Sequence, residues 1–206
     1  MSESGRGRDT RAKMLEVAGR QFAAKGYEGA HLESIATEVG VRKTALYYYF
    51  ENKEALYVAV LEQMLAEFER ALIASWDESR PKAESLRAGA AALNDVLAAH
   101  PTFAQILIRI FVDRVPIDET RVRPYLERLL AGAVRFFDEG VAEGAFRPLS
   151  GVHILQSALG MAIFHYAGGE FSAQLTGVES IHSDKSSIER REQFVEVLLR
   201  GVLAGD

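Results

Sequence analysis

Residues 40–53 carry the side chains of this chain that are best suited to nucleic-acid chemistry, and they read GVRKTALYYYFENK. Arginine and lysine pair with phosphate oxygens or with guanine, and threonine and tyrosine hydroxyls form hydrogen bonds with base edges or phosphates. These side chains can act together only if one rigid element presents them. The elements around residues 40–53 therefore decide how the segment is interpreted.

Two short helices joined by a glycine turn are predicted to position these side chains. A helix with one buried face has apolar residues at i, i+3, i+4 and i+7, and this spacing occurs at Leu32, Ile35, Ala36 and Val39. Gly40 follows as the turn residue, and a second helix is expected over 43–50. A helix, a turn and a basic second helix form an arrangement that enters the major groove of DNA.

The helical projection of residues 43–50 separates inward from outward side chains. At 100° per residue, Leu46 and Phe50 point toward the first helix, and Thr44 and Tyr48 point away, where they can touch base edges. Alternatively, the tyrosines build a small core and the lysines form a solvated edge, but this leaves an outward Tyr48 unexplained. The predicted backbone contacts come from Tyr47, Tyr49 and, at the next helix start, Lys53.

The apolar period of 3.6 extends along nearly the whole chain, without a convincing strand, so the fold class is all-α with about nine helices. Pro124 lies in the first turns of the seventh pattern, so that helix either begins there or is kinked. The Gly- and Ser-rich stretch 168–187 is expected to be a mobile loop. The predicted helices are 11–25, 32–39, 43–50, 53–75, 82–99, 102–112, 119–143, 152–167 and 188–203.

Composition narrows the possible compartments and partners. Residues 1–53 contain nine Lys and Arg against seven Asp and Glu, whereas the whole chain has a formal net charge of −5, so the basic part is N-terminal. The absence of cysteine excludes disulfides and thiolate chemistry. No apolar run approaches a membrane span or a signal peptide. A cytoplasmic protein without a membrane partner is expected.

Several short motifs together resemble the N-terminal DNA-binding domain of the tetracycline-repressor (TetR) family, over about residues 8–57. The matching segments are 26–27, 35–36, 40–41, 46–50 and 52–56. The resemblance implies an N-terminal arm and helix-turn-helix domain at 1–53 and a ligand-binding and dimerisation domain at 54–206. It also implies a homodimer on a palindromic double-stranded DNA operator, and groove-facing or backbone-binding roles for Arg42, Lys43, Thr44, Tyr47, Tyr48, Tyr49 and Lys53.

The chain departs from the common family pattern at two positions. Ala30-His31 stands where a Thr or Ser usually precedes the second helix, which removes a hydroxyl cap and a phosphate donor; His31 is predicted to substitute for it. Arg42 stands where a small Ser is common, and it adds a charge beside the groove. The operator sequence therefore cannot be taken from relatives.

Residues 54–206 carry weaker signals for an effector and a subunit interface. Arg109 is either an anchor for an acidic ligand or one half of a solvent-facing pair with Asp113, and the pair is favoured. The effector is unidentified and expected to be largely apolar. Candidate ligand-binding residues are Phe103, Arg109, Phe137, Gln156 and Phe164. Candidate interface residues on two helices are His153, Ser157, Gly160, Val195, Leu198, Leu199 and Val202.

The function expected from these features is a DNA-binding transcriptional regulator, most simply a repressor released by a small molecule. The alternative is an all-helical small-molecule carrier or enzyme whose N-terminal helices are only structural, and an activator is a third possibility. No catalytic triad, phosphate loop or metal-ligand spacing is present, so no enzyme activity, metal or cofactor is expected.

Overall fold

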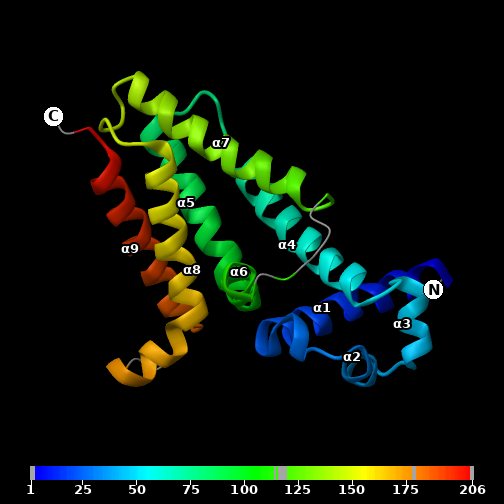
Figure 1. Ribbon diagram of the computed structural model, residues 1–206. Helices are drawn as coiled ribbons and strands as arrows, with labels where there is room; N and C mark the ends of the chain where they lie inside the picture. The colour runs from blue at the N-terminus through cyan, green and yellow to red at the C-terminus, as the bar shows by residue number, and fades with distance from the viewer. Residues whose placement is uncertain (1–2, 114, 116–119, 178–179, 205–206) are drawn as a thin grey trace.

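Helices make up almost all of the regular structure, as the periodicity predicts. The computed structural model describes residues 3–113, 115, 120–177 and 180–204. Within these residues there are nine helices, which Figure 1 labels in chain order. Their bounds are α1 (Glu3–Gly29), α2 (Leu32–Val39), α3 (Lys43–Tyr49), α4 (Lys53–Ser75), α5 (Lys82–Ala99), α6 (Pro101–Asp113), α7 (Arg123–Ala142), α8 (Gly151–Thr176) and α9 (Asp184–Val202).

The first three helices and the start of α4 form one end of the molecule (Figure 1). Gly26 breaks α1 with φ 73° and ψ 176°, a left-handed backbone that favours glycine, so the predicted end of the first helix is confirmed as a kink. Phe22 of α1 packs edge-on against Tyr57 of α4, with 4.8 Å between the ring centroids. Burial raises the pKa of Tyr57 to about 12, as expected for a phenol inside an apolar core.

The remaining helices form the larger end of the molecule, and α4 connects the two ends (Figure 1). The N-terminal half of α4 is buried on all sides from Leu56 to Leu61, because α1 covers one face and helices of the larger end cover others. At the far end of α4, Trp76 lies edge-on to Phe136 of α7, with the ring centroids 5.6 Å apart. A displacement of either end of α4 is thus passed to the other end.

A second connection between the two ends runs through Arg109 of α6. Its guanidinium donates to the carbonyl oxygens of Ala23 (2.7 Å) and Ala24 (2.9 Å), which lie just before the kink in α1. It also forms an ion pair with Asp113 at 3.5 Å. The predicted Arg109 pair is thus present, but it faces α1 and not open solvent. A cation at these helix-terminal carbonyls is favoured by the helix dipole.

Replacing Arg109 with glutamine is expected to lower the free energy of unfolding by about 2 kcal/mol, because two charge-assisted hydrogen bonds are removed. For a chain of this size this change lowers Tm by about 4–8 °C. Arg128→Gln is the control, since Arg128 pairs with Glu69 at 2.7 Å and its side chain is 54% exposed. Thermal unfolding of both variants checks the prediction, and an equal fall in Tm for both would contradict it.

The expected mobile loop over 168–187 is wrong for most of its length. Helix α8 continues to Thr176 and α9 begins at Asp184, with the Ser183 side chain accepting a hydrogen bond from the Ser186 amide. Gly169, which suggested a loop, lies inside α8, and a Cβ at this position would clash with the Ile181 side chain. The glycine allows close packing in this place and does not break the helix.

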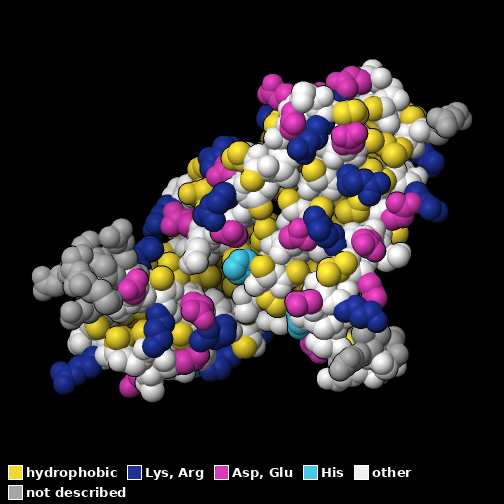
Figure 2. Space-filling view, turned by 180° about the vertical axis from the view of Figure 1, so that it is seen from behind, with side chains coloured by type: hydrophobic (Ala, Val, Ile, Leu, Met, Phe, Trp, Pro, Cys, Tyr) yellow, Lys and Arg dark blue, Asp and Glu magenta, His cyan; other side chains and the backbone are white. Residues whose placement is uncertain are grey.

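Helix α1 begins at Glu3, eight residues before the predicted start at Arg11, and the other boundaries agree with the prediction to within a few residues. Helix α7 begins at Arg123 with Pro124 in its first turn, so the helix starts at the proline and is not kinked by it. The predicted start at Glu119 lies outside the described residues. None of the described helices combines the length and the apolar composition needed to cross a membrane. On the face shown in Figure 2, Lys and Arg lie among Asp and Glu, without one sign dominating.

Candidate nucleic-acid interface

Helix α3 presents one buried and one exposed face, as the helical projection predicts. Leu46 is 1% exposed and Phe50, which caps the helix, is 5% exposed, so both belong to the core. On the other side Tyr48 is 84% exposed and Thr44 is also exposed. An outward tyrosine on a helix of seven residues does not contribute to the core. Helix α3 thus offers a polar, aromatic surface of the size that fits a DNA major groove.

The turn before α3 is fixed by α1 and by its own glycine. Gly40 has φ 86°, and its amide donates to the carbonyls of Ala36 and Thr37, which ends α2. The Lys13 ammonium donates to the Val39 carbonyl at 2.9 Å, and the Arg11 guanidinium lies 5.4 Å from the Phe50 ring centroid. These two cations therefore hold the helix-turn-helix in place; this role is not visible in the local sequence pattern.

Three cations lie at the starts of α3 and α4. Arg42, the N-cap of α3, and Lys43 are both exposed, and the Arg42 side chain does not cap the helix. At α4 the Asn52 side chain accepts from the Ala55 amide at 2.8 Å and fixes the first turn. Lys53 donates to the Glu28 carbonyl at 3.1 Å and lies 4.6 Å from the Tyr27 ring centroid. Two helix N-termini with cations form a surface that attracts phosphate.

His31 takes the N-cap position of α2 but does not replace the missing hydroxyl as a cap. Its backbone is extended, with φ −111°, and its side chain makes no capping hydrogen bond. The imidazole is exposed beside the first turn of α2. Tyr47 is 48% exposed, whereas Tyr49 packs partly against the core, with its ring 5.2 Å from that of Tyr48. The candidate residues thus lie at the surface to different degrees.

The five candidate ligand-binding residues do not come together around one cavity. Phe103 stacks on His100 with 4.5 Å between ring centroids, and Phe137 is buried against Phe136 and Phe146. Gln156 is exposed and Phe164 is 68% exposed. Arg109 is bound to α1, as described above. Periodicity identified apolar or polar faces correctly, but it cannot show which faces of separate helices meet.

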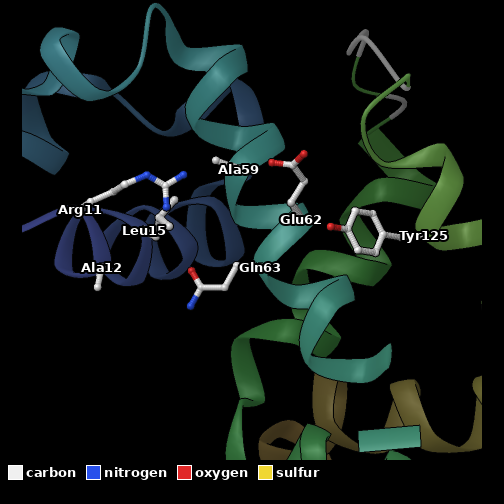
Figure 3. A pocket seen from close by; sticks show the side chains of 7 residues that line it. All are labelled: Arg11, Ala12, Leu15, Ala59, Glu62, Gln63 and Tyr125. Atoms are coloured by element: carbon white, nitrogen blue, oxygen red, sulfur yellow. The ribbon is translucent and has the colours of Figure 1, made fainter. Parts of the chain in front are cut away.

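Two surface grooves lie among the described residues, and both are away from the five candidate ligand-binding residues. An open groove of about 480 Å³ lies between α1, α4 and the start of α7 (Figure 3). In Figure 3, the Tyr125 hydroxyl of α7 points toward α4 beside Glu62, at one side of this groove. A second groove of about 350 Å³ follows the outer face of α7 from Arg123 to Ala131. None of the five candidate ligand-binding residues lines either groove.

The candidate interface residues divide into two groups. On α8, His153, Ser157 and Gly160 are exposed, in keeping with a contact surface. On α9, the four candidates are only 4–6% exposed because α9 packs its apolar stripe on α5, so they belong to the core of the protomer and their assignment to the interface was wrong. These four core residues are Val195, Leu198, Leu199 and Val202.

Three large apolar side chains of α8 are exposed on one face of the helix. Exposed fractions of 68–72% leave these side chains without cover from the described rest of the protomer. Exposed Ser157 and Gly160 lie on the same face, and the spacings of three, four and seven residues suit a helix packed against a partner. We call this face the α8 outer stripe, and its large members are Phe164, Phe171 and Leu175.

His165, on the inner side of α8, makes the stability of the fold sensitive to acid. Burial, followed by the nearby charges of Arg190 and His182, lowers the pKa of His165 from 6.5 to about 4. Between these values the unfolded chain binds a proton that the folded chain does not. Stability is therefore complete above pH 6.5 and decreases as the pH falls toward 4.

Between pH 7.5 and pH 5 the His165 contribution is expected to be at most about 2 kcal/mol. The variant His165→Gln should show a correspondingly smaller decrease in Tm between these pH values. His153→Gln, which changes an exposed histidine of the same helix, should behave like the wild-type protein. The same decrease in all three proteins would show that His165 does not titrate in this way.

The comparisons with known proteins agree with this architecture. The model of the family described as bacterial regulatory proteins, tetR family, matches residues 14–60. The HTH-type transcriptional repressor NicS of Pseudomonas putida is 33% identical over 98 residues, which are 48% of this chain and 46% of the repressor. The HTH-type transcriptional regulator RutR of Escherichia coli K12 is 52% identical over 52 residues, 25% of this chain and 24% of RutR.

The chain thus aligns with less than half the length of these two curated relatives, but the fold similarity is nearly complete. AibR, solved in complex with isovaleryl coenzyme A and operator DNA, has a TM-score of 0.73 and 19% sequence identity, with 92% of this chain and 98% of AibR covered. Both curated relatives are transcriptional regulators. Residues 14–60 thus match the tetR family of bacterial regulatory proteins in sequence, and nearly the whole chain shares its fold with AibR.

Proposed function

We propose that the protein is a DNA-binding transcriptional regulator, and most simply a repressor that a small molecule releases from its operator. The observation that carries this proposal is α3, which buries Leu46 and Phe50 and leaves Thr44 and Tyr48 exposed. A short helix anchored by its apolar face, with a polar aromatic face outward, suits major-groove contacts. The module at residues 1–53 binds DNA in this proposal, and residues 54–206 respond to the effector and dimerise.

The contacts of the module divide into base contacts and phosphate contacts. Thr44 and Tyr48 are assigned to base edges because they point most directly away from the core. Arg42 and Lys43 at the start of α3 are assigned to phosphate or guanine. Phosphate contacts are assigned to the exposed or half-exposed remainder of the surface, which comprises His31, Tyr47, Tyr49 and Lys53.

A homodimer follows from the α8 outer stripe in this proposal. Phe164 and Phe171 are each 68% exposed, and such large apolar side chains in a row are costly to leave in water. Exposed Ser157 and Gly160 on the same helix allow a second helix to approach closely. A second copy presents the same stripe, and a twofold axis through it would place two α3 helices on two half-sites.

A response to a small molecule has a parallel in AibR, a protein of the same fold that was solved in complex with isovaleryl coenzyme A and operator DNA. In this chain, Arg109 and α4 both join the effector part to the DNA-binding part. A ligand that moved α6 or α4 would therefore tilt α1 and α3 together. A regulator of genes acts where the DNA is, so the proposal includes a cytoplasmic location. It does not include an enzymatic activity.

The alternative is an all-helical carrier or enzyme with a structural N-terminal domain. It predicts small-molecule binding without a preference for inverted repeats. The test is fluorescence anisotropy with DNA from upstream of the protein's own gene, at several salt concentrations. The proposed regulator binds this DNA more tightly than a scrambled duplex, and log K decreases linearly with log salt. Equal binding to both duplexes would favour the alternative.

A further inference from the structure

A group of buried and half-buried polar side chains, which includes His165, lies between α5, α8 and α9. Three of its nitrogens have no hydrogen-bond partner among the described residues: Asn94 Nδ2, His165 Nε2 and Arg190 Nε. The group is continuous, since the Tyr166 hydroxyl donates to Asn94 Oδ1 at 3.1 Å and His165 packs edge-on to Tyr166 at 4.8 Å. Asn94, His165, Tyr166 and Arg190 are here called the polar cluster.

Arg190 is the cation of the polar cluster, and no described carboxylate pairs with it. Its Nη2 donates to the Met161 carbonyl at 2.6 Å, and its guanidinium lies 5.6 Å from the Phe194 ring centroid. The nearby Asp95 is paired instead with Arg191, at 3.3 Å. Burial lowers the pKa of Arg190. Arg190 is half-buried, and its Nε atom is covered and has no hydrogen-bond partner among the described residues. A partly desolvated guanidinium without a paired carboxylate favours the approach of an anion.

The other members of the polar cluster complete a set of donors. Asn94 is only 2% exposed, and its carbonyl oxygen is used by Tyr166, so its free amide can only donate. His165 is neutral at pH 7 because burial lowers its pKa to about 4, and a neutral imidazole can donate from Nε2. A water molecule could satisfy one such donor, but it could not neutralise Arg190. The matching group is an oxyanion.

We propose that the polar cluster binds the carboxylate or phosphate of an acidic effector, with Arg190 as the ion-pair partner and Asn94 and His165 as hydrogen-bond donors. This inference rests on the proposed function and names the chemical class of its effector. The proposed effector is thus a largely apolar molecule with one acidic group, which is bound by Arg190 and not by Arg109. The tip of the α8–α9 connection lies beside the cluster, where the His182 ring stacks on Tyr166 at 6.5 Å.

The ligand-free protein already allows one test of this assignment. If Arg190 binds an anion, Arg190→Met removes a half-buried cation that has no carboxylate partner among the described residues and keeps most of the side-chain volume. The Met161 carbonyl, which accepts from Arg190, lies inside α8 and can keep its helical hydrogen bond. The variant is expected to raise Tm by about 2–4 °C. A fall in Tm would show that Arg190 is a structural residue and would overturn the proposal.

The binding test uses thermal shift on the full-length protein with sodium octanoate, sodium benzoate and sodium phosphate at constant ionic strength. Octanamide and benzamide are the neutral counterparts, and Arg191→Gln is the control for Arg190→Gln. At least one of the three oxyanions should raise Tm in proportion to the logarithm of its concentration. Comparing the two carboxylates with phosphate shows which type of anion the polar cluster prefers. The wild-type protein and Arg191→Gln should respond alike, and Arg190→Gln should not respond.

The proposal is overturned if no oxyanion stabilises the wild-type protein more than its neutral counterpart does, or if Arg190→Gln responds like the wild-type protein. Operator binding by the same preparations keeps this result separate from the proposed function. Arg190-dependent oxyanion binding without specific DNA binding would contradict the proposed regulatory function but support the anion site. Specific DNA binding without any oxyanion response would contradict only the anion site.

Discussion

Tyr48→Ala lowers affinity for the operator by about 10- to 100-fold, because a base contact from the centre of α3 is worth about 1–3 kcal/mol. Tyr48 is 84% exposed and packs only edge-on to Tyr49, so the fold should keep its stability. Fluorescence anisotropy on the operator and on a scrambled duplex measures the change in affinity. Affinity for the scrambled duplex should change little, because a base contact contributes to specificity and not to general attraction.

Lys43→Ala provides the contrast that separates base binding from phosphate binding. If Lys43 binds phosphate, both duplexes bind more weakly, and the slope of log K against log salt decreases in magnitude by about 0.9 for each phosphate that is no longer neutralised. Lys185→Ala is the matched control, since that lysine has a side chain 85% exposed on α9, at the other end of the chain. If Tyr48→Ala binds the operator as tightly as the wild-type protein does, α3 does not bind in the major groove.

Phe164→Asp combined with Phe171→Asp is expected to convert the proposed dimer to a monomer and to lower operator affinity by at least about 100-fold. Both side chains belong to the α8 outer stripe, and a carboxylate on each would face its counterpart across the twofold axis. Two linked half-sites gain about 10²–10⁴ in affinity over one, and a monomer does not have this gain. Light scattering measures the mass, and anisotropy measures the binding.

Ile73→Asp is the control for the dimer prediction. Ile73 is also 68% exposed but lies on α4, outside the α8 outer stripe. It should leave both mass and DNA affinity unchanged. If the double Phe variant remains a dimer with a native circular dichroism spectrum, the stripe is not the subunit interface.

The helix-turn-helix was the part of the fold that local sequence could predict best. Leu46 and Phe50 are inward and Tyr48 is outward because a short helix with two apolar positions has one way to pack, and Gly40 can end α2 with a positive φ. Neighbouring residues in the sequence determine all of these features. The local sequence pattern was therefore sufficient to predict the helix-turn-helix.

The parts that were predicted poorly depend on contacts between distant segments. Leu198 and Phe164 both lie on apolar helical faces, but Leu198 packs on α5 and Phe164 is exposed, so periodicity alone could not separate core from interface. Gly169 suggested a loop, whereas it makes room for Ile181 twelve residues later. Arg109 contacts α1 and Arg190 contacts α8, and both partners lie far from these arginines in sequence.

In the proposed complex, two copies of α3 bind the two halves of an inverted repeat. Selection of bound duplexes from a random DNA pool by the full-length protein, followed by sequencing, tests this arrangement, with Tyr48→Ala selected in parallel. The wild-type protein should enrich an inverted repeat, and Tyr48→Ala should not. Enrichment of no repeat by the wild-type protein, or of the same repeat by both proteins, would contradict this arrangement.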